Sequence, residues 1–280
     1  RMHAVHSKAR GDADGFRFPY HRVATGEESR CQLAVVVGLC LTAAAALLAP
    51  RLVAAALHSS LTARAPPNLV TIALTGGPCA GKTSALSALE ASAKSAGYHM
   101  MVSTEIATLM RAGGCDEAIT PALAFQTSLV RLQVQLEDAL AAVGAATDLP
   151  TILITDRGAM DAKSYMSPHT WSAVLEAIGA TEESLLSRYD GVIHLVTAAD
   201  GAPQSYKWGN VTDDSGHWVY RKESPEEAIV TDRRTQAAWA AHPRRVIIPN
   251  AGSFSNKTKH AAMAMLMIAH ETHPGLASAR

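Results

Sequence analysis

One short glycine-rich run has the residue types and the spacing needed to hold a nucleoside triphosphate. It matches the phosphate-binding pattern G-x-x-x-x-G-K-[ST] and consists of Gly76, Gly77, Pro78, Cys79, Ala80, Gly81, Lys82 and Thr83. In such a loop, backbone N–H groups surround the phosphate oxygens, the lysine contacts the β- and γ-phosphates, and the last hydroxyl binds Mg²⁺. We predict that this loop, together with Ser84, binds ATP or GTP with Mg²⁺.

The sequence on either side of the loop supplies the two elements that the loop needs. Residues 69–75 are apolar, β-branched and uncharged, as expected of a buried strand in a parallel sheet. Residues 82–96 are rich in Ala, Ser and Leu and predict a helix that begins at Lys82. A chance match in a glycine-containing turn is the alternative, and the strand, loop and helix in register argue against it.

Two other apolar runs end in charged side chains. Residues 151–155 are followed by Asp156 and Arg157, and a run that ends near Thr104 is followed by Glu105. Ligands of open α/β sheets bind at the carboxyl edge of the strands, so these side chains are predicted to meet the phosphate loop there.

We therefore predict four catalytic residues, namely Lys82, Asp156, Arg157 and Glu105. Asp156 would join Thr83 as a magnesium ligand or accept a proton from an acceptor hydroxyl, and Arg157 would neutralise charge on the transferring phosphoryl group. Glu105 would contact the acceptor or a magnesium-bound water. The alternatives are a surface salt bridge for Asp156 and Arg157, and for Glu105 a carboxylate that stabilises a helix N-terminus.

Alternating apolar and helical stretches predict the fold class. Strands are expected near residues 69–75, 98–104, 151–155, 192–197 and 245–248. This pattern predicts an α/β P-loop NTPase fold of nucleoside-kinase type, with a parallel five-stranded sheet and helices on both faces. His194 lies in the fourth strand and is expected to be a core residue. The irregular polar stretch that follows, up to Lys222, is expected to form a lid over phosphates, and a helix is expected to begin at Ser224 and Pro225.

A leucine stripe predicts which face of a long helix is buried. Over residues 120–143, leucines recur at mostly helical spacing, and we expect this stripe to face the core. Its members are Leu123, Leu129, Leu132, Leu136 and Leu140.

Composition and charge divide the chain into segments. Residues 1–30 are predicted to be a disordered tail, 31–57 a transmembrane or targeting segment, 58–67 a linker, and 68–280 the nucleotide-binding domain. Basic and acidic residues balance at 25 each and form no basic stripe, which argues against nucleic acid as a partner. The four cysteines show neither disulfide nor zinc spacing.

The apolar segment leaves two localisations open. Residues 31–50 form an uncharged run that is long enough to span a bilayer. No acidic residue occurs between Cys31 and Leu89, as is common in targeting sequences. The segment is expected either to anchor the protein in a membrane or to be removed as a presequence of plastid type. In both cases the nucleotide domain is expected in a reducing compartment.

The sequence resembles the NadR-like AAA domains, which include bacterial nicotinamide-riboside kinases and the TRPL-translocation-defect protein of insect photoreceptors, and it is most similar to the eukaryotic branch. The resemblance is carried by Leu74–Thr83, Ser103–Glu105, Asp156–Lys163, Tyr189–Ala202, Glu226–Ala228, Asp232, Trp239 and His242–Pro243. It implies a kinase-like P-loop fold that binds ATP or GTP. For the photoreceptor branch it also implies phosphoinositide binding and usually a second domain of triphosphate-tunnel type, which residues up to Arg280 do not contain.

Two functions are consistent with these observations. The first is a small-molecule kinase, whose partners are a nucleoside triphosphate and a small acceptor with a hydroxyl. The second is a membrane-associated GTP-binding regulatory or trafficking protein that binds phosphoinositide lipid and has little catalysis. Residues Asn256 and Lys257 match the start of an N-K-x-D guanine-binding element, but Lys259 stands in place of the aspartate, so the base preference stays open.

Overall fold

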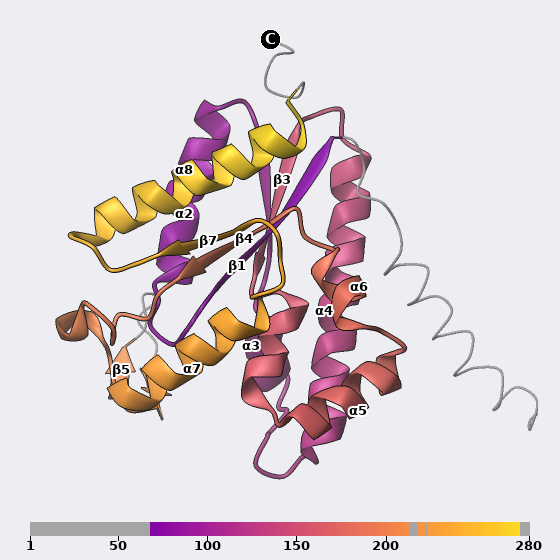
Figure 1. Cartoon of the computed structure of the whole chain (residues 1–280), viewed down its shortest axis with the longest axis vertical. Helices are drawn as coiled ribbons and strands as arrows, with labels where there is room; N and C mark the ends of the chain where they lie inside the picture. Colours follow the sequence, from indigo (N-terminus) through magenta and orange to yellow (C-terminus); the bar gives the residue numbers. More distant parts are fainter. Residues whose placement is uncertain (1–67, 213–217, 222, 275–280) are drawn as a thin grey trace, which may run out of the picture. The chain divides into compact units, whose positions relative to one another are not determined.

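The computed structural model of the chain describes residues 68–212, 218–221 and 223–274 (Figure 1). The predicted tail 1–30, apolar segment 31–57 and linker 58–67 lie outside the described residues. Within the described ranges, no helix is both long enough and apolar enough to cross a membrane.

Five parallel strands form the central sheet, as the sequence predicted. They are β1 (Leu69–Gly76), β2 (His99–Ser103), β3 (Thr151–Asp156), β4 (Gly191–Leu195) and β7 (Arg245–Ile248). Their order is β2-β3-β1-β4-β7, with every neighbouring pair parallel. The strand that leads into the phosphate loop is therefore central, and its carboxyl end lies between those of β3 and β4.

Helices cover both faces of this sheet (Figure 1). They are α2 (Lys82–Ser95), α3 (Ile106–Ala112), α4 (Ala122–Ala145), η1 (Ala159–Tyr165), α5 (Pro168–Ile178), α6 (Glu182–Leu186), η2 (Pro203–Ser205), α7 (Pro225–Ala238) and α8 (Phe254–Thr272). On one face, Ile72 and Leu74 of β1 pack with α2 and α8. On the other, Ala73 packs with α4, α5 and the end of α7. Because successive strand residues point to opposite faces, β1 contributes to both cores.

The buried face of α4 differs from the predicted leucine stripe. Leu123 is exposed and the other four leucines are only half-buried, whereas Val130, Gln133, Val134 and Glu137 are buried. The true face is rotated by about one residue, or about 100°. Hydrogen bonds to a buried carboxylate explain this rotation. Glu137 accepts from Gln133, Tyr189 and Arg188, so the side of α4 that carries Gln133 and Glu137 faces the core.

The stretch after β4 is more regular than predicted. It contains the short helix η2 and a two-stranded antiparallel hairpin of β5 (Gly209–Thr212) and β6 (Trp218–Arg221). Helix α7 then begins at Pro225, with Ser224 as its N-cap in a capping box with Glu227, as the Ser-Pro sequence predicted. The hairpin thus leads directly into α7.

Candidate functional site

The phosphate loop joins β1 to α2 and needs its glycines for steric reasons. Gly76 has φ +145°, and a Cβ there would lie 2.1 Å from the carbonyl oxygen of Leu195. Gly81 is the N-cap of α2 with φ +83°, and a Cβ there would meet the ring of Phe254 at 2.5 Å. A side chain at either position is therefore excluded by the backbone and by its neighbours.

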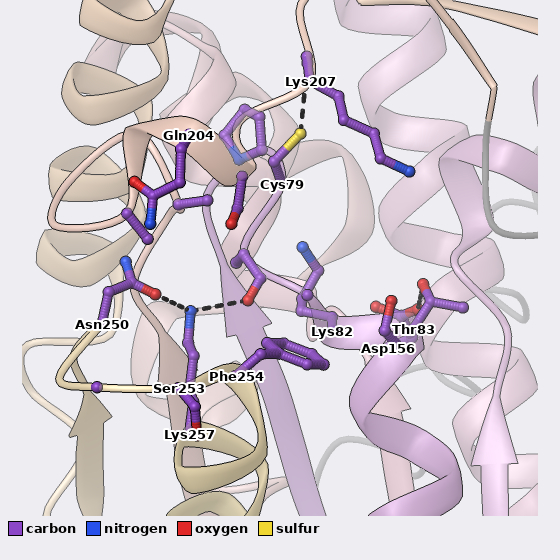
Figure 2. A pocket seen from close by; sticks show the side chains of 18 of the residues that line it. Cys79, Lys82, Thr83, Asp156, Gln204, Lys207, Asn250, Ser253, Phe254 and Lys257 are labelled. Carbon is purple, nitrogen blue, oxygen red and sulfur yellow. Dashed lines mark hydrogen bonds between the residues drawn. The ribbon is translucent and has the colours of Figure 1, made fainter.

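The loop forms the floor of a cavity of about 500 Å³ (Figure 2). Residues 78–84 line it, with Glu105, Asp156 and Arg157 beside them, and with side chains from 198–207 and 250–257 completing the lining. Gly76 and Gly77 are buried beneath the floor. The structure thus brings together Lys82, Thr83 and the three charged residues at the carboxyl ends of β2 and β3.

The ammonium of Lys82 lies on the loop itself. Its Nζ donates to the carbonyl oxygens of Gly76 at 3.2 Å and Gly77 at 3.4 Å. Burial and the positive charge of Arg157 lower the pKa of Lys82 to about 8. The lowered pKa means that the protonated form of Lys82 is destabilised in the nucleotide-free site, at the position where phosphate oxygens are expected to bind.

Asp156 and Thr83 lie side by side and suit a magnesium ion. Thr83 Oγ1 donates to Asp156 Oδ2 at 3.4 Å, while Asp156 Oδ1 is buried and has no hydrogen-bond partner among the described residues (Figure 2). Burial raises the pKa of the Asp156 carboxyl. Mg²⁺ prefers oxygen ligands and commonly uses one or two side chains plus phosphates and water. The hydroxyl of Thr83 and the unpartnered oxygen of Asp156 are ligands of this kind.

Arg157 and Glu105 form an ion pair at the wall of the cavity. Arg157 Nε donates to Glu105 Oε1 at 2.5 Å, and the two side chains are only 17% and 28% exposed. Although burial opposes the change, Arg157 lowers the pKa of Glu105 to about 2, and Glu105 helps to raise the pKa of Arg157. The pair is therefore not an exposed surface salt bridge. Glu105 contacts Arg157, which was predicted to be catalytic, and it also immediately precedes α3.

The backbone of Arg157 is held in an uncommon conformation. Its φ is +67°, in the left-handed region that non-glycine residues rarely adopt. Gln133 Nε2 donates to its carbonyl oxygen at 3.2 Å, and the N–H of Ala159 donates to the hydroxyl of Tyr189 at 2.7 Å. Strain of this kind persists where surrounding contacts enforce it, and here the polar face of α4 and Tyr189 do so. Sequence reasoning missed these supporting residues.

Two charged residues beneath the loop also received no role from sequence reasoning. Asp232 of α7 accepts a hydrogen bond from the N–H of Gly77, and Lys257 of α8 donates to the carbonyl oxygen of Ala80. Lys257 belongs to the partial N-K-x-D match, and its contacts are with backbone and with Asn250. His194 is fully buried, as expected of a core residue, and its Nε2 contacts Asp232 at 3.1 Å.

Comparison with known proteins gives a family. Residues 71–257 match the model of a family described as AAA domain. No curated protein matches the chain. Among solved structures, the chain is similar to NadR protein in complex with NAD and AMP-PNP, at 16% identity and a TM-score of 0.45 over 73% of this chain and 49% of that one. It is likewise similar to NadR protein in complex with NR, at 16% identity and a TM-score of 0.47 over 73% and 52%. The chain spans about half the length of these NadR chains.

Proposed function

This chain belongs to the AAA domain family and is a nucleotide-binding P-loop domain, and from that premise we propose that it is a phosphotransferase that moves the γ-phosphoryl group of ATP to a hydroxyl of a small molecule. The observation that carries the proposal is the position of Asp156, Arg157 and Glu105. A domain that only bound nucleotide would need the loop, Lys82 and a magnesium ligand. Here a mostly buried arginine, Arg157, and a second carboxylate, Glu105, lie in the same cavity in addition to those groups.

The residues divide the work of phosphoryl transfer. Backbone N–H groups of the loop and Lys82 would hold the phosphates, and Thr83 and Asp156 would hold Mg²⁺, which when bound offsets phosphate charge. The bond between the γ-phosphorus and the bridging oxygen breaks as the acceptor oxygen bonds to the same phosphorus. Arg157 would neutralise the equatorial oxygens during this exchange.

The acceptor proton must leave during transfer, and Asp156 is suited to receive it. A raised pKa makes a carboxylate a better base near neutral pH. Asp156 is thus a candidate both for this base and for a metal ligand, and the Asp156→Asn variant is expected to lose transfer in either role. Glu105, ion-paired with Arg157, would contact the acceptor from the same wall.

Side chains around the cavity favour ATP over GTP. Guanine carries N–H donors that are best matched by a carboxylate, but Glu105 and Asp156 are the only carboxylates among the described lining residues, and both lie beside the phosphate-binding residues. The amide of Asn250 already donates to the carbonyl oxygens of Val196, Thr197 and Asp200. The base would lie near Asn250 and Phe254, where the described lining offers no carboxylate and the ammonium of Lys257 contacts Asn250 at 2.7 Å.

The second function suggested by the resemblance, a membrane-associated GTP-binding protein that binds phosphoinositide, is favoured by no observation in the described part of the chain. Tight GTP binding without phosphoryl transfer would support this second function.

The test measures binding and transfer in the same preparation of the full chain. Titration calorimetry with non-hydrolysable ATP and GTP analogues and Mg²⁺ gives the base preference, and a γ-phosphate transfer screen over nucleoside-type hydroxyl compounds, nicotinamide riboside included, gives the reaction. We expect Lys82→Ala to abolish binding. Asp156→Asn should bind nucleotide but lose transfer by about 10²-fold or more, whereas Asp148→Asn, an exposed aspartate outside the cavity, should behave as wild type. Binding without transfer to any acceptor would refute the phosphotransferase.

A further inference from the structure

Two side chains of opposite charge are buried directly beneath the phosphate loop, and neither has a role in the chemistry proposed above. Asp232 is 2% exposed and Lys257 is 4% exposed. Burying a charge is strongly unfavourable unless hydrogen bonds compensate for lost water. Both residues have such bonds, and in both cases one of the bonds is made to the loop backbone.

Asp232 holds the start of the loop. Its Oδ1 accepts from the N–H of Gly77 at 2.8 Å and from the N–H of Thr197 at 3.0 Å, and its Oδ2 accepts from Gln236 at 2.9 Å. A Cβ added to Gly77 would lie 2.7 Å from Oδ1, so the loop backbone lies directly against the carboxylate.

Lys257 holds the other end of the loop. Its Nζ donates to the carbonyl oxygen of Ala80 at 2.9 Å, to that of Val196 at 2.6 Å, and to Asn250 Oδ1 at 2.7 Å. Figure 2 shows the bond between Lys257 and Asn250. An ammonium has three protons, so all three are used. Like Asp232, Lys257 links the loop to the segment that follows β4.

These bonds set the orientation of two peptide planes. In a trans peptide the C=O of one residue and the N–H of the next point in opposite directions. With the Gly77 N–H on Asp232, the carbonyl of Gly76 points the other way, where it accepts from Lys82 at 3.2 Å and Arg157 at 3.3 Å. With the Ala80 carbonyl on Lys257, the N–H of Gly81 points away from Lys257.

We propose that Asp232 and Lys257 are positioning residues that together hold the phosphate loop in its nucleotide-binding shape. Asp232 directs the Gly76 carbonyl toward the side chains of Lys82 and Arg157. Lys257 keeps the Ala80 carbonyl away from the phosphates. Without Lys257 that carbonyl would be free to rotate and to present an oxygen to an anionic ligand. The inference rests on the proposed nucleotide site but not on phosphoryl transfer.

A matched control separates positioning from simple stabilisation. Asp190 also accepts a backbone N–H of β1, that of Thr71 at 2.8 Å, but at the opposite end of the strand from the loop. Asp190→Ala should therefore destabilise the fold without affecting nucleotide binding. Asp232→Ala should affect both.

The experiment measures the Kd of the Mg²⁺ complex of a non-hydrolysable ATP analogue by calorimetry, well below the melting temperature of each variant. We expect Asp232→Ala and Lys257→Met to weaken binding by about tenfold or more, because a loop that is not preorganised must be ordered on binding. Asp232→Asn retains a carbonyl oxygen for the Gly77 N–H, so it should stay within about threefold of wild type. Asp190→Ala should leave Kd within about twofold while lowering the melting temperature.

Each outcome decides one question. Unchanged Kd in both Asp232→Ala and Lys257→Met, or an equal loss in Asp190→Ala, would overturn the positioning role. If Asp232→Ala does not fold, Lys257→Met alone decides, and the proposal fails if its Kd is that of wild type. Absence of nucleotide binding by the wild-type chain would instead refute the proposed function.

Discussion

The pKa of Lys82 makes nucleotide affinity depend on pH in a calculable way. In the nucleotide-free protein this pKa is lowered to about 8 by burial and by Arg157. Bound phosphates favour the charged form, so the pKa rises in the complex. Binding is therefore strongest below pH 8, where Lys82 is already protonated, and weakens as pH rises through 8 because a proton must be taken up.

The expected size follows from the protonated fraction of Lys82. With a pKa of about 8, this fraction is about 0.9 at pH 7 and about 0.1 at pH 9. Affinity for a non-hydrolysable ATP analogue should thus fall about tenfold, or about 1.4 kcal/mol, over this range. Phosphate groups ionise near pH 6, so they contribute little to the change.

Calorimetry in two buffers of different ionisation enthalpy measures both the Kd and the proton uptake. We expect uptake of about 0.9 proton per site at pH 9 and about 0.1 at pH 7. Lys82→Arg is the control, because arginine stays protonated throughout this range and removes the Lys82 contribution. Lys257 also has a pKa lowered to about 8, and the slope that remains in Lys82→Arg reports its share. A Kd independent of pH in the wild type, or an equal slope in both proteins, would refute the reasoning.

Two substitutions test the packing behind the site. Tyr189→Phe removes the hydroxyl that accepts from Ala159 and donates to Glu137, so we expect the free energy of unfolding to fall by about 1–3 kcal/mol in urea denaturation; an unchanged midpoint would contradict this bond pattern. Gly158→Ala places a Cβ 2.7 Å from the ring of Trp239, and overpacking should cost about 1–3 kcal/mol and lower the melting temperature. Since Gly158 has φ −106°, no backbone strain adds to that cost, and an unaffected melting temperature would mean that the ring can move.

Local sequence was sufficient for the sheet and for the residues that meet at its carboxyl edge. The strands expected near 69–75, 151–155 and 245–248 are found within one residue of those bounds. Apolar β-branched runs identify buried parallel strands because both faces are covered, and the phosphate loop fixes which strand is central. The parallel direction then places the residues that follow each strand at one edge, which is why Glu105 and Asp156 could be expected near the loop.

Contacts between residues distant in sequence could not be predicted. The bond from Gly77 to Asp232 joins residues that are 155 apart in the chain, and nothing in the spacing around Asp232 marks it as a residue beneath the loop. The α4 leucine stripe was misleading for a related reason. Helical periodicity gives the more apolar side of a helix, but a buried partner such as Arg188 can favour a polar side, and that partner lies in the turn between α6 and β4.

Because β1 is the central strand, the cavity has two walls formed by different stretches of the sequence, one on each side of the phosphate loop. Residues that follow β2 and β3 supply the wall with Glu105, Asp156 and Arg157, whereas residues 198–207 and 250–257, which follow β4 and β7, supply the opposite wall. The two walls therefore come from separate stretches of sequence that share only the phosphate loop. We expect that substitutions at Asn250 and Phe254, where the base is expected, would alter the choice of nucleotide, and that variation between 99 and 178 would alter the choice of acceptor proposed above, so the two specificities could be engineered one at a time.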